Sequence, residues 1–291
     1  MEKAARAVIP GGMEKAAMSE VMQTGRVAVS RDRHGGRFWR RFDSYGFARP
    51  LRCVPVVLAE IEQAASAFPL VFRRDAETGR IEIVALLHLT AEEPTPFVTT
   101  EGTWRGTYVP SALRAHPFAA APSDQGDDMA LLVDEASGLV TDDPKDEPFF
   151  DAAGAPSAAL EQVITFFRTR ATSAQATAAA CAALDAAGLL TPLAPLSGMT
   201  GADARGFLAV DPEALAGIDA PTLWSLWQGG ALRLAQGHRV SLCHAGWMAR
   251  ALQAGAGATP RGAHAKAPPD AGLTGFLDAL AEAQNHDRGD A

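Results

Sequence analysis

Four basic side chains stand close together in the stretch SRDRHGGRFW. An arginine guanidinium holds several N–H donors in one plane and can bind a carboxylate or a phosphate, to which a nearby imidazole adds a further donor. Neighbouring arginines also favour the neutral form of that imidazole near pH 7. The stretch therefore predicts a site for a small anion, with a turn histidine bonded to the backbone as the alternative. The candidate residues are Arg31, Arg33, His34 and Arg37.

A second polar group lies in the stretch TYVPSALRAHPF, between two prolines. The first proline can start a short helix, and the second must end it. Tyr108, Arg114 and His116 could then form one polar wall. Since His116 would point partly away from the helix face that carries Arg114, the three side chains need not converge. The alternative is that Tyr108 and Phe118 anchor the core while Arg114 pairs with an acid.

The third candidate is His238 in the stretch GHRVSLCH. His238 and Ser241 share a helix face, which predicts either a polar pocket lining or a satisfied pair in the core. His244 lies six positions further on, about 120° away around a straight helix, so the two histidines cannot bind one metal ion together. The sequence has no HExxH or CxxC pair and no phosphate-binding glycine loop after a strand, so we expect no metal and no cofactor.

No nucleophile of a known catalytic pattern can be assigned. The sequence has no GxSxG motif, and Cys243 stands directly before His244, where helical neighbours diverge by about 100°. Asp134 and Asp211 end strand-like runs, but each precedes a turn, where an aspartate is favoured for its own backbone bonds. An enzyme that uses His34, His116 or His238 as an acid–base group is therefore the second interpretation.

Composition restricts the class of protein. The chain has 291 residues, 47% of them hydrophobic, with a formal net charge of -8 and a pI near 5.4, which disfavours a nucleic-acid-binding protein. The charge is uneven, with eight arginines against two aspartates in residues 26–52, and ten acids against one lysine in residues 124–151. Three cysteines without pairing, no signal-peptide pattern and no long apolar run predict a cytoplasmic protein without a membrane span. We expect each cysteine to be a small buried residue.

Short strands and helices must position these residues. Residues 25–50 alternate like strands around a polar turn, and residues 70–89 predict two strands. We expect a helix from Pro55 to Phe68. A long alanine-rich helix should run from Ser157 to Ala187, with Ser157 as its N-cap and Gly188 as its C-cap.

The C-terminal part reads as helical between residues 222 and 253. Its glycines, which include Gly237, predict two helices with a break. Trp224, Trp227 and Trp247 are expected to pack in the core, with an aromatic groove for a peptide or a partner helix as the alternative. The stretch LTGFLDALAEAQ, which follows a Gly, Ala and Pro-rich linker, predicts a further short amphipathic helix.

The chain resembles the bacterial SapC-like family. The resemblance rests on the order and spacing of SRDRHGGRFW, YGFAR, VPVVLAEIEQAASAFPLVF, TYVPSALRAHPF, LLVDEASGLV, AGAPS, GFLAVD and ALRLAQGHRVSLCHAGWMAR, from Gly25 to Arg250. It implies the fold and, by the family's name, a link to paracrystalline surface layers. A surface-layer role is the third interpretation, because this Ala-rich chain with cysteines and no export signal is unlike a typical surface-array protein.

These observations predict an α+β fold: a single compact domain with a mixed or antiparallel sheet, one long Ala-rich helix and a C-terminal helical pair. Residues 1–24 should form a flexible segment, residues 25–253 the SapC-like domain, and residues 254–291 a linker and short helix. The leading functional interpretation is a non-enzymatic accessory protein that binds a peptide, a protein or a small anionic ligand. The sequence does not decide the oligomeric state.

Overall fold

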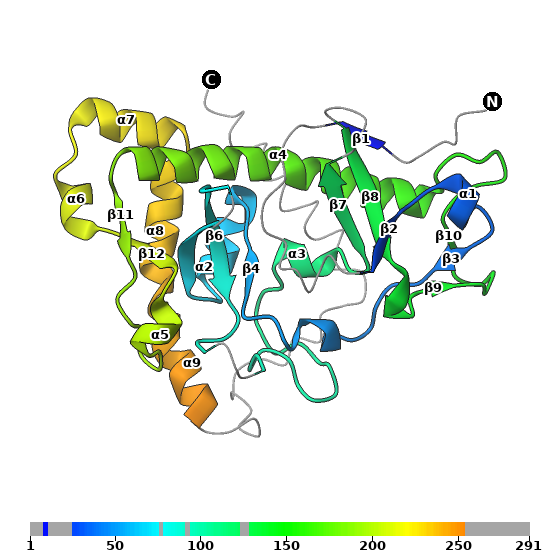
Figure 1. The fold of residues 1–291 in the computed structure, drawn as a ribbon, viewed down its shortest axis with the longest axis horizontal. Helices are drawn as coiled ribbons and strands as arrows, with labels where there is room; N and C mark the ends of the chain where they lie inside the picture. Colours follow the sequence, from blue (N-terminus) through cyan, green and yellow to red (C-terminus); the bar gives the residue numbers. More distant parts are fainter. Residues whose placement is uncertain (1–7, 11–24, 76–77, 91–93, 123–127, 254–291) are drawn as a thin grey trace. The chain divides into compact units, whose positions relative to one another are not determined.

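The computed structural model describes residues 8–10, 25–75, 78–90, 94–122 and 128–253 (Figure 1). They belong to two compact units, Met1–Asp43 with Ala115–Gln175 and Ser44–Arg114 with Ala176–Ala291. Each unit combines antiparallel strands with helices, so the expected α+β class is confirmed. The expected boundaries after residues 24 and 253 stay predictions, because most of the first segment and all of the last lie outside the described residues.

The first unit is built on a sheet with β8 at its centre. This strand pairs with β7 on one edge and with β1 and β2 on the other, all antiparallel. In β8 every second residue is buried, namely Met129, Leu131 and Val133, as expected of a strand with one face on a core. The strands are β1 (Val8–Pro10), β2 (Arg26–Ala28), β7 (Phe118–Pro122) and β8 (Asp128–Asp134).

A smaller sheet in the same unit holds the C-terminal end of the basic stretch. Here β3 (Phe38–Trp39) lies between β10 (Glu147–Pro148) and β9 (Val140–Thr141). The segment predicted as a polar turn is instead the short helix α1 (Arg31–His34). The 3-10 turn η4 (Glu135–Ser137) links β8 to β9, where Gly138 adopts the left-handed φ of +73°.

The second unit is built on a five-stranded antiparallel sheet in the order β11-β12-β5-β6-β4. The predicted strand pair of residues 70–89 is confirmed as β5 and β6. The predicted helix from Pro55 is much shorter, because Pro55 ends β4 and α2 begins at Ile61. The strands are β4 (Cys53–Pro55), β5 (Leu70–Arg74), β6 (Ile81–Leu86), β11 (Leu190–Pro192) and β12 (Phe207–Val210).

The predicted long helix is α4 (Ala158–Ala186), which begins in the first unit and ends in the second. Both predicted caps are confirmed. The Ser157 hydroxyl accepts the backbone N–H of Leu160 at 3.1 Å, and Gly188 follows the helix with a φ of +68°. The shorter elements are η2 (Gly46–Ala48), η3 (Leu58–Glu60), α2 (Ile61–Ala65), α3 (Ser111–Arg114), α5 (Gly201–Ala204) and α6 (Pro212–Ala216).

The C-terminal region forms three helices rather than two: α7 (Ala220–Gln228), α8 (Ala231–Ser241) and α9 (His244–Gln253). Gly237 lies inside α8 and does not break it. A Cβ atom on Gly237 would stand 2.9 Å from Cγ1 of Ile61 in α2, so this glycine permits a close approach of the two helices.

Two side chains of α8 join this helix to the sheet of the second unit. Strands β12 and β5 pair at Leu208 and Phe72, and the same register would set Val210 opposite Leu70. Instead, the His238 ring stands between these two residues: its Nδ1 donates to the Leu70 carbonyl at 2.7 Å, and its Nε2 accepts the Val210 N–H at 3.2 Å. The Ser241 hydroxyl accepts the Leu70 N–H at 2.8 Å. The N–H and C=O groups of Leu70 and the N–H group of Val210 are therefore satisfied where the strands diverge.

Substitution of His238 should reveal this role as a loss of stability. His238 is 1% exposed, and burial lowers its pKa to about 4, against the smaller opposing effect of the bond to Leu70. We expect His238→Gln to lose about 3 kcal/mol of unfolding free energy at pH 7, because buried backbone groups lose their partners. Urea unfolding measures the loss.

The same substitution should change the dependence of stability on pH. The unfolded chain takes up a proton near pH 6.5 and folded His238 only near pH 4, so its contribution is complete above about pH 6.5 and falls by up to about 3 kcal/mol toward pH 4. Since the pKa of His116 is also lowered to about 4, both proteins lose stability in acid. The difference between wild type and variant should therefore shrink from pH 7 to pH 4; a constant difference would contradict this assignment.

Candidate functional site

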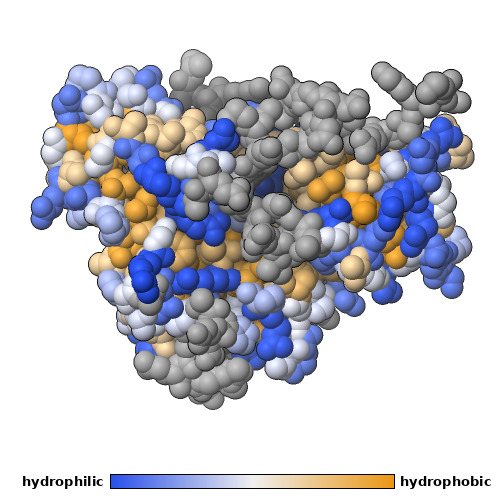
Figure 2. Space-filling view, viewed as in Figure 1, coloured by the Kyte–Doolittle hydropathy of each residue, from blue (hydrophilic) through white to orange (hydrophobic). Residues whose placement is uncertain are grey.

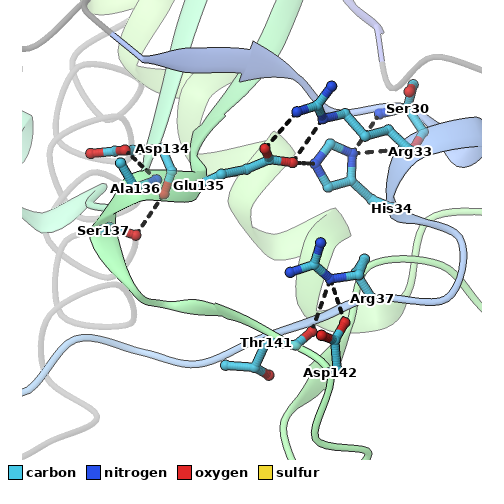
Figure 3. A network of polar contacts seen from close by, with 10 residues as sticks. All are labelled: Ser30, Arg33, His34, Arg37, Asp134, Glu135, Ala136, Ser137, Thr141 and Asp142. Atoms are coloured by element: carbon cyan, nitrogen blue, oxygen red, sulfur yellow. Dashed lines mark hydrogen bonds and ion pairs between the residues drawn. The ribbon is translucent and has the colours of Figure 1, made fainter.

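The predicted anion site in the first unit is occupied by a carboxylate of the chain itself (Figure 3). The Arg33 guanidinium donates from Nε and Nη2 to the two oxygens of Glu135, at 2.8 and 2.7 Å. Nε2 of His34 stands 3.2 Å from the same carboxylate. Helix α1 supplies the basic partners and η4 the acid, so the network joins two segments far apart in sequence.

His34 is fully buried, between the backbone of Ser30 and the Glu135 carboxylate. Its Nδ1 lies 3.2 Å from the backbone nitrogen and 3.3 Å from the carbonyl oxygen of Ser30, and its Nε2 faces Glu135. Burial is the largest cause that lowers the pKa of His34, whereas the bond to Arg33 lowers the pKa of Glu135. A buried imidazole therefore stands beside an ionised carboxylate that Arg33 holds by two hydrogen bonds.

The other two arginines of the stretch, Arg31 and Arg37, differ in their partners. Arg37 pairs with Asp142, with 2.6 Å between Nε and Oδ1, and its Nε also lies 3.4 Å from the Thr141 carbonyl (Figure 3). The exposed guanidinium of Arg31 lies against Gly154, where a Cβ atom would stand 2.2 Å from Cζ of Arg31. For Arg31 the described ranges show no carboxylate partner. Two of the three predicted cations are thus neutralised within the unit.

The second predicted group divides between the two units. Tyr108 and Arg114 belong to the second unit and meet there, whereas His116 belongs to the first. The link between the first two is direct: Arg114 donates from Nη2 to the Tyr108 hydroxyl at 2.6 Å, and its Cζ lies 5.2 Å from the centre of the Tyr108 ring. His116 instead meets the ring of Phe42 edge-on, 5.7 Å between centroids.

Tyr108 and Arg114 converge on Glu60, a carboxylate that is 1% exposed. Its Oε2 accepts the Tyr108 hydroxyl at 2.6 Å and the Ser111 N–H at 2.8 Å. Its Oε1 accepts the Ser111 hydroxyl at 2.7 Å and the Val57 N–H at 3.1 Å. Nη2 of Arg114 completes the site at 3.8 Å from Oε2. Four hydrogen bonds and one cation balance the cost of burying this charge.

The Glu60 cluster, formed by Glu60, Val57, Tyr108, Ser111 and Arg114, connects two segments of the second unit. It ties the turn before α2 to the first turn of α3, since Val57 and Ser111 both donate their backbone N–H to it. Burial, and next the charge of Glu60, raise the pKa of Tyr108, so its hydroxyl remains a donor. This arrangement matches the alternative in which Arg114 pairs with an acid.

Sequence reasoning missed the three acids that organise these networks. Glu135 and Asp142 lie in the acidic range 124–151, and Glu60 lies in the helix predicted from Pro55 to Phe68. Glu60 did carry a signal, because a glutamate three residues after a helix entry commonly accepts a backbone N–H there. The predicted turn roles of Asp134 and Asp211 are confirmed: Asp134 accepts the N–H of Ala136, and Asp211 caps α6.

The tryptophans of α7 are exposed, which corrects the expected core packing. Trp224 is 61% exposed, Trp227 60% and Leu223 45%. In a helix these three positions lie within an arc of about 100°, so they form one face. We call Leu223, Trp224 and Trp227 the α7 face; Figure 2 shows surface of mixed hydropathy in the region where Figure 1 places α7. Trp247 is half-buried, 5.6 Å from the ring of Phe97.

The described ranges offer no metal site, no membrane-spanning helix and no disulfide. No group of three His, Cys, Asp or Glu side chains there could hold a metal ion, and no helix there is both long and apolar enough to cross a membrane. The cysteines are free thiols: Cys181 is buried as expected, Cys53 is intermediate, and Cys243 is exposed. The expected burial of Cys243 is therefore wrong.

Glu60→Gln tests the junction in the second unit. The amide would place an N–H₂ group where an oxygen now accepts two donors, so we expect the free energy of unfolding to fall by about 3 kcal/mol. Glu62→Gln is the matched control, because this exposed glutamate pairs with Arg233 at the surface, and it should cost less than about 1 kcal/mol. Equal urea midpoints for the two variants would show that the cluster adds nothing to stability.

Glu135→Gln tests whether the chain fills its own anion site. Removal of the charge leaves Arg33 without its ionised partner, so 50 mM phosphate should stabilise the variant by about 1 kcal/mol more than it stabilises wild type. Thermal unfolding with and without phosphate measures this, with Glu147→Gln, at an exposed position of β10, as the control. An equal phosphate effect on wild type would mean that Glu135 does not occupy the site.

Comparisons with known proteins agree with the resemblance in the sequence. The family model described as SapC matches residues 29–246. No curated protein and no solved structure matches the chain. The matched range holds both polar networks, the α7 face and most of the described elements. Because this match covers well over half of the 291 residues, the chain belongs to the SapC family.

Proposed function

We propose that this chain is a non-enzymatic accessory protein that binds a protein or peptide partner through the α7 face. The observation that carries the proposal is the exposure of Trp224 and Trp227, at 61% and 60%, on one side of a short helix. Tryptophan is enriched among the residues that dominate binding energy at protein interfaces, because one side chain combines a large apolar area with few rotatable bonds.

The position of α7 suits a docking surface. Only Leu226 of this helix is buried, at 3%, so α7 contributes little to the core of its own unit. Both ends are nevertheless fixed: the Asp219 carboxylate accepts the Thr222 N–H at 2.8 Å, and Gly230 turns the chain with a φ of +74°. A helix held at both ends presents its side chains in a defined arrangement, which lowers the entropy lost on binding.

The area of the face is sufficient for a small interface. From the exposed fractions, its three side chains offer on the order of 300 Å². At about 25 cal/mol per Å², complete burial would contribute roughly 8 kcal/mol before the cost of association. A peptide of one or two helical turns, or an edge of a larger protein, would match such a patch.

The polar networks give less support to a small anionic ligand. Arg33, Arg37 and Arg114 each face a carboxylate of the chain, so an anion would have to displace Glu135, Asp142 or Glu60. The enzyme alternative has less support, because both ring nitrogens of His238 are bonded to the backbone and the His34 ring faces Glu135, a carboxylate of the chain itself. The surface-layer alternative likewise rests on the family name. A cytoplasmic location is part of this proposal, and the free thiols agree with a reducing compartment.

Selection from a random peptide library, followed by titration of synthetic peptides, tests the proposal. We expect peptides with apolar residues at helical spacing, with dissociation constants in the micromolar range. Trp224→Ser with Trp227→Ser should weaken them at least tenfold, because the variant loses most of the apolar contact. Fluorescence anisotropy of labelled peptides measures the affinity.

Ser225→Ala with Gln228→Ala is the matched control, because both side chains are exposed on the same helix and lie outside the α7 face. This control should keep the wild-type affinity. Peptides that bind the tryptophan-free variant as tightly as wild type, or a selection that enriches no peptide, would overturn the proposal.

A further inference from the structure

We infer that the partner of the α7 face is a basic amphipathic helix, with its lysine or arginine side chains over the N-terminal end of α7. This inference rests on the proposed function, since it names the chemistry of the partner for the same surface. It is carried by the charges of three described helices that follow one another in the chain, α6, α7 and α8 (Figure 1).

The apolar stripe of α7 begins directly after an acid. Four residues at positions i, i+3, i+4 and i+7 form this stripe, namely Ala220, Leu223, Trp224 and Trp227. Asp219, the N-cap of the helix, directly precedes the first of them. At 1.5 Å per residue, the N-cap lies about 8 Å along the axis from Trp224. Since this is about one Debye length at physiological ionic strength, the carboxylate attracts a cation bound beside that tryptophan.

Two further acids lie near this end of α7. Residues 206–232 contain Asp211, Glu213 and Asp219, and no lysine, arginine or histidine. Three residues join α6 to α7, so the two helix ends are at most about 14 Å apart. Glu213 and Asp219 are exposed, and no ion pair among the described residues engages either of them. Negative charge without a basic counterpart therefore borders the stripe.

Asp219 keeps its charge at neutral pH. Its carboxylate accepts the Thr222 N–H at 2.8 Å, and the hydrogen bonds from the side chain and backbone of Thr222 lower the pKa of Asp219. These bonds leave Asp219 exposed. A cationic side chain of a partner can therefore approach this carboxylate from solvent.

The C-terminal end of α7 is followed by a neutral pair. In the first turn of α8, Arg233 donates from Nε and Nη2 to Glu62 at 3.0 and 2.9 Å, so its charge is compensated. The stripe thus runs from a negative end at Asp219 to a balanced end after Trp227. A bound helix would place its basic residues toward Asp219 and its apolar residues on the tryptophans, whose ring faces also attract ammonium and guanidinium groups.

Two other occupants complement this surface less well. A second copy would bring the same acids and no base in this region, and it would bury about 300 Å² per partner, far below the roughly 800 Å² of a stable interface. A membrane surface suits exposed tryptophans, but the negative potential of an anionic bilayer repels the acids beside them. The charge pattern therefore favours a positively charged peptide or protein helix.

Titration of three model peptides tests the inference. The peptides share one stripe of leucines at helical spacing and carry lysine, glutamine or glutamate in one terminal turn. At about 20 mM salt we expect wild type to bind the lysine peptide about fivefold more tightly than the glutamine peptide, and the glutamate peptide about fivefold more weakly. At about 300 mM salt both differences should shrink to less than about twofold. Fluorescence anisotropy of labelled peptides measures the affinities.

Glu213→Gln/Asp219→Asn removes both exposed acids. Asparagine keeps the N-cap of α7, so circular dichroism should show unchanged helix content. The preference of this variant for lysine over glutamine should fall below about twofold, whereas it should bind the glutamine peptide as wild type does. Glu147→Gln/Glu161→Gln is the matched control, because it removes the same charge at exposed positions of the first unit, and it should keep the wild-type preference.

Any of four results would overturn a basic partner. The lysine and glutamine peptides could bind wild type equally, or the control could lose the preference as fully as the test variant. Wild type, but not Trp224→Ser/Trp227→Ser, could bind vesicles of phosphatidylcholine and phosphatidylserine, or could form a dimer in sedimentation. The last two results would assign the α7 face to a membrane or to a second copy.

The same titrations separate this inference from the proposed function. If the lysine and glutamine peptides bind equally and only to intact tryptophans, the basic partner fails and the proposed function stands. If none of the peptides binds wild type, or if Trp224→Ser/Trp227→Ser binds them as tightly, the proposed function fails and the inference falls with it. A lysine preference that needs both the tryptophans and the acids supports both.

Discussion

The arrangement of the second unit depends on the insertion of the His238 ring between β5 and β12. Strands that diverge leave buried N–H and C=O groups, and each unpaired group costs about as much as a lost hydrogen bond. Here an imidazole both donates and accepts, so one side chain satisfies Leu70 and Val210 at once. The ring also fixes α8 on the sheet. Helix α7 directly precedes α8 in the chain. The position of the α7 face therefore depends on how His238 attaches α8 to the sheet.

The chain balances its buried and half-buried charges within each unit. In the first unit Arg33 and His34 share Glu135, and in the second Tyr108 and Arg114 share Glu60. Breaking such a pair on one side is costly, because the remaining charge loses its compensation. Networks of this type specify how segments meet, and they place a carboxylate of the chain against Arg33 and Arg114. The uncharged α7 face therefore carries the functional proposal, and the basic stretch does not.

The sequence was most informative where local rules decide structure. The caps of α4, the strand pair β5–β6 and the turn aspartates followed from residue types at fixed spacing. The acids that meet the predicted arginines could not be identified, because the partners of Arg33 and Arg114 lie 102 and 54 positions away along the chain. The exposure of Trp224 was also unpredictable, since an apolar helix stripe looks the same whether it faces the core or a partner.

The close approach of Gly237 to Ile61 has an evolutionary consequence. Helices α8 and α2 leave room for no more than a hydrogen at position 237, because even a methyl group would stand 2.9 Å from the isoleucine side chain. A larger residue there would be tolerated only if position 61 became smaller, as volume-conserving exchanges in a packed interior are the least damaging. The two positions should therefore covary among SapC relatives, and their joint identity would record the spacing of these helices in each lineage.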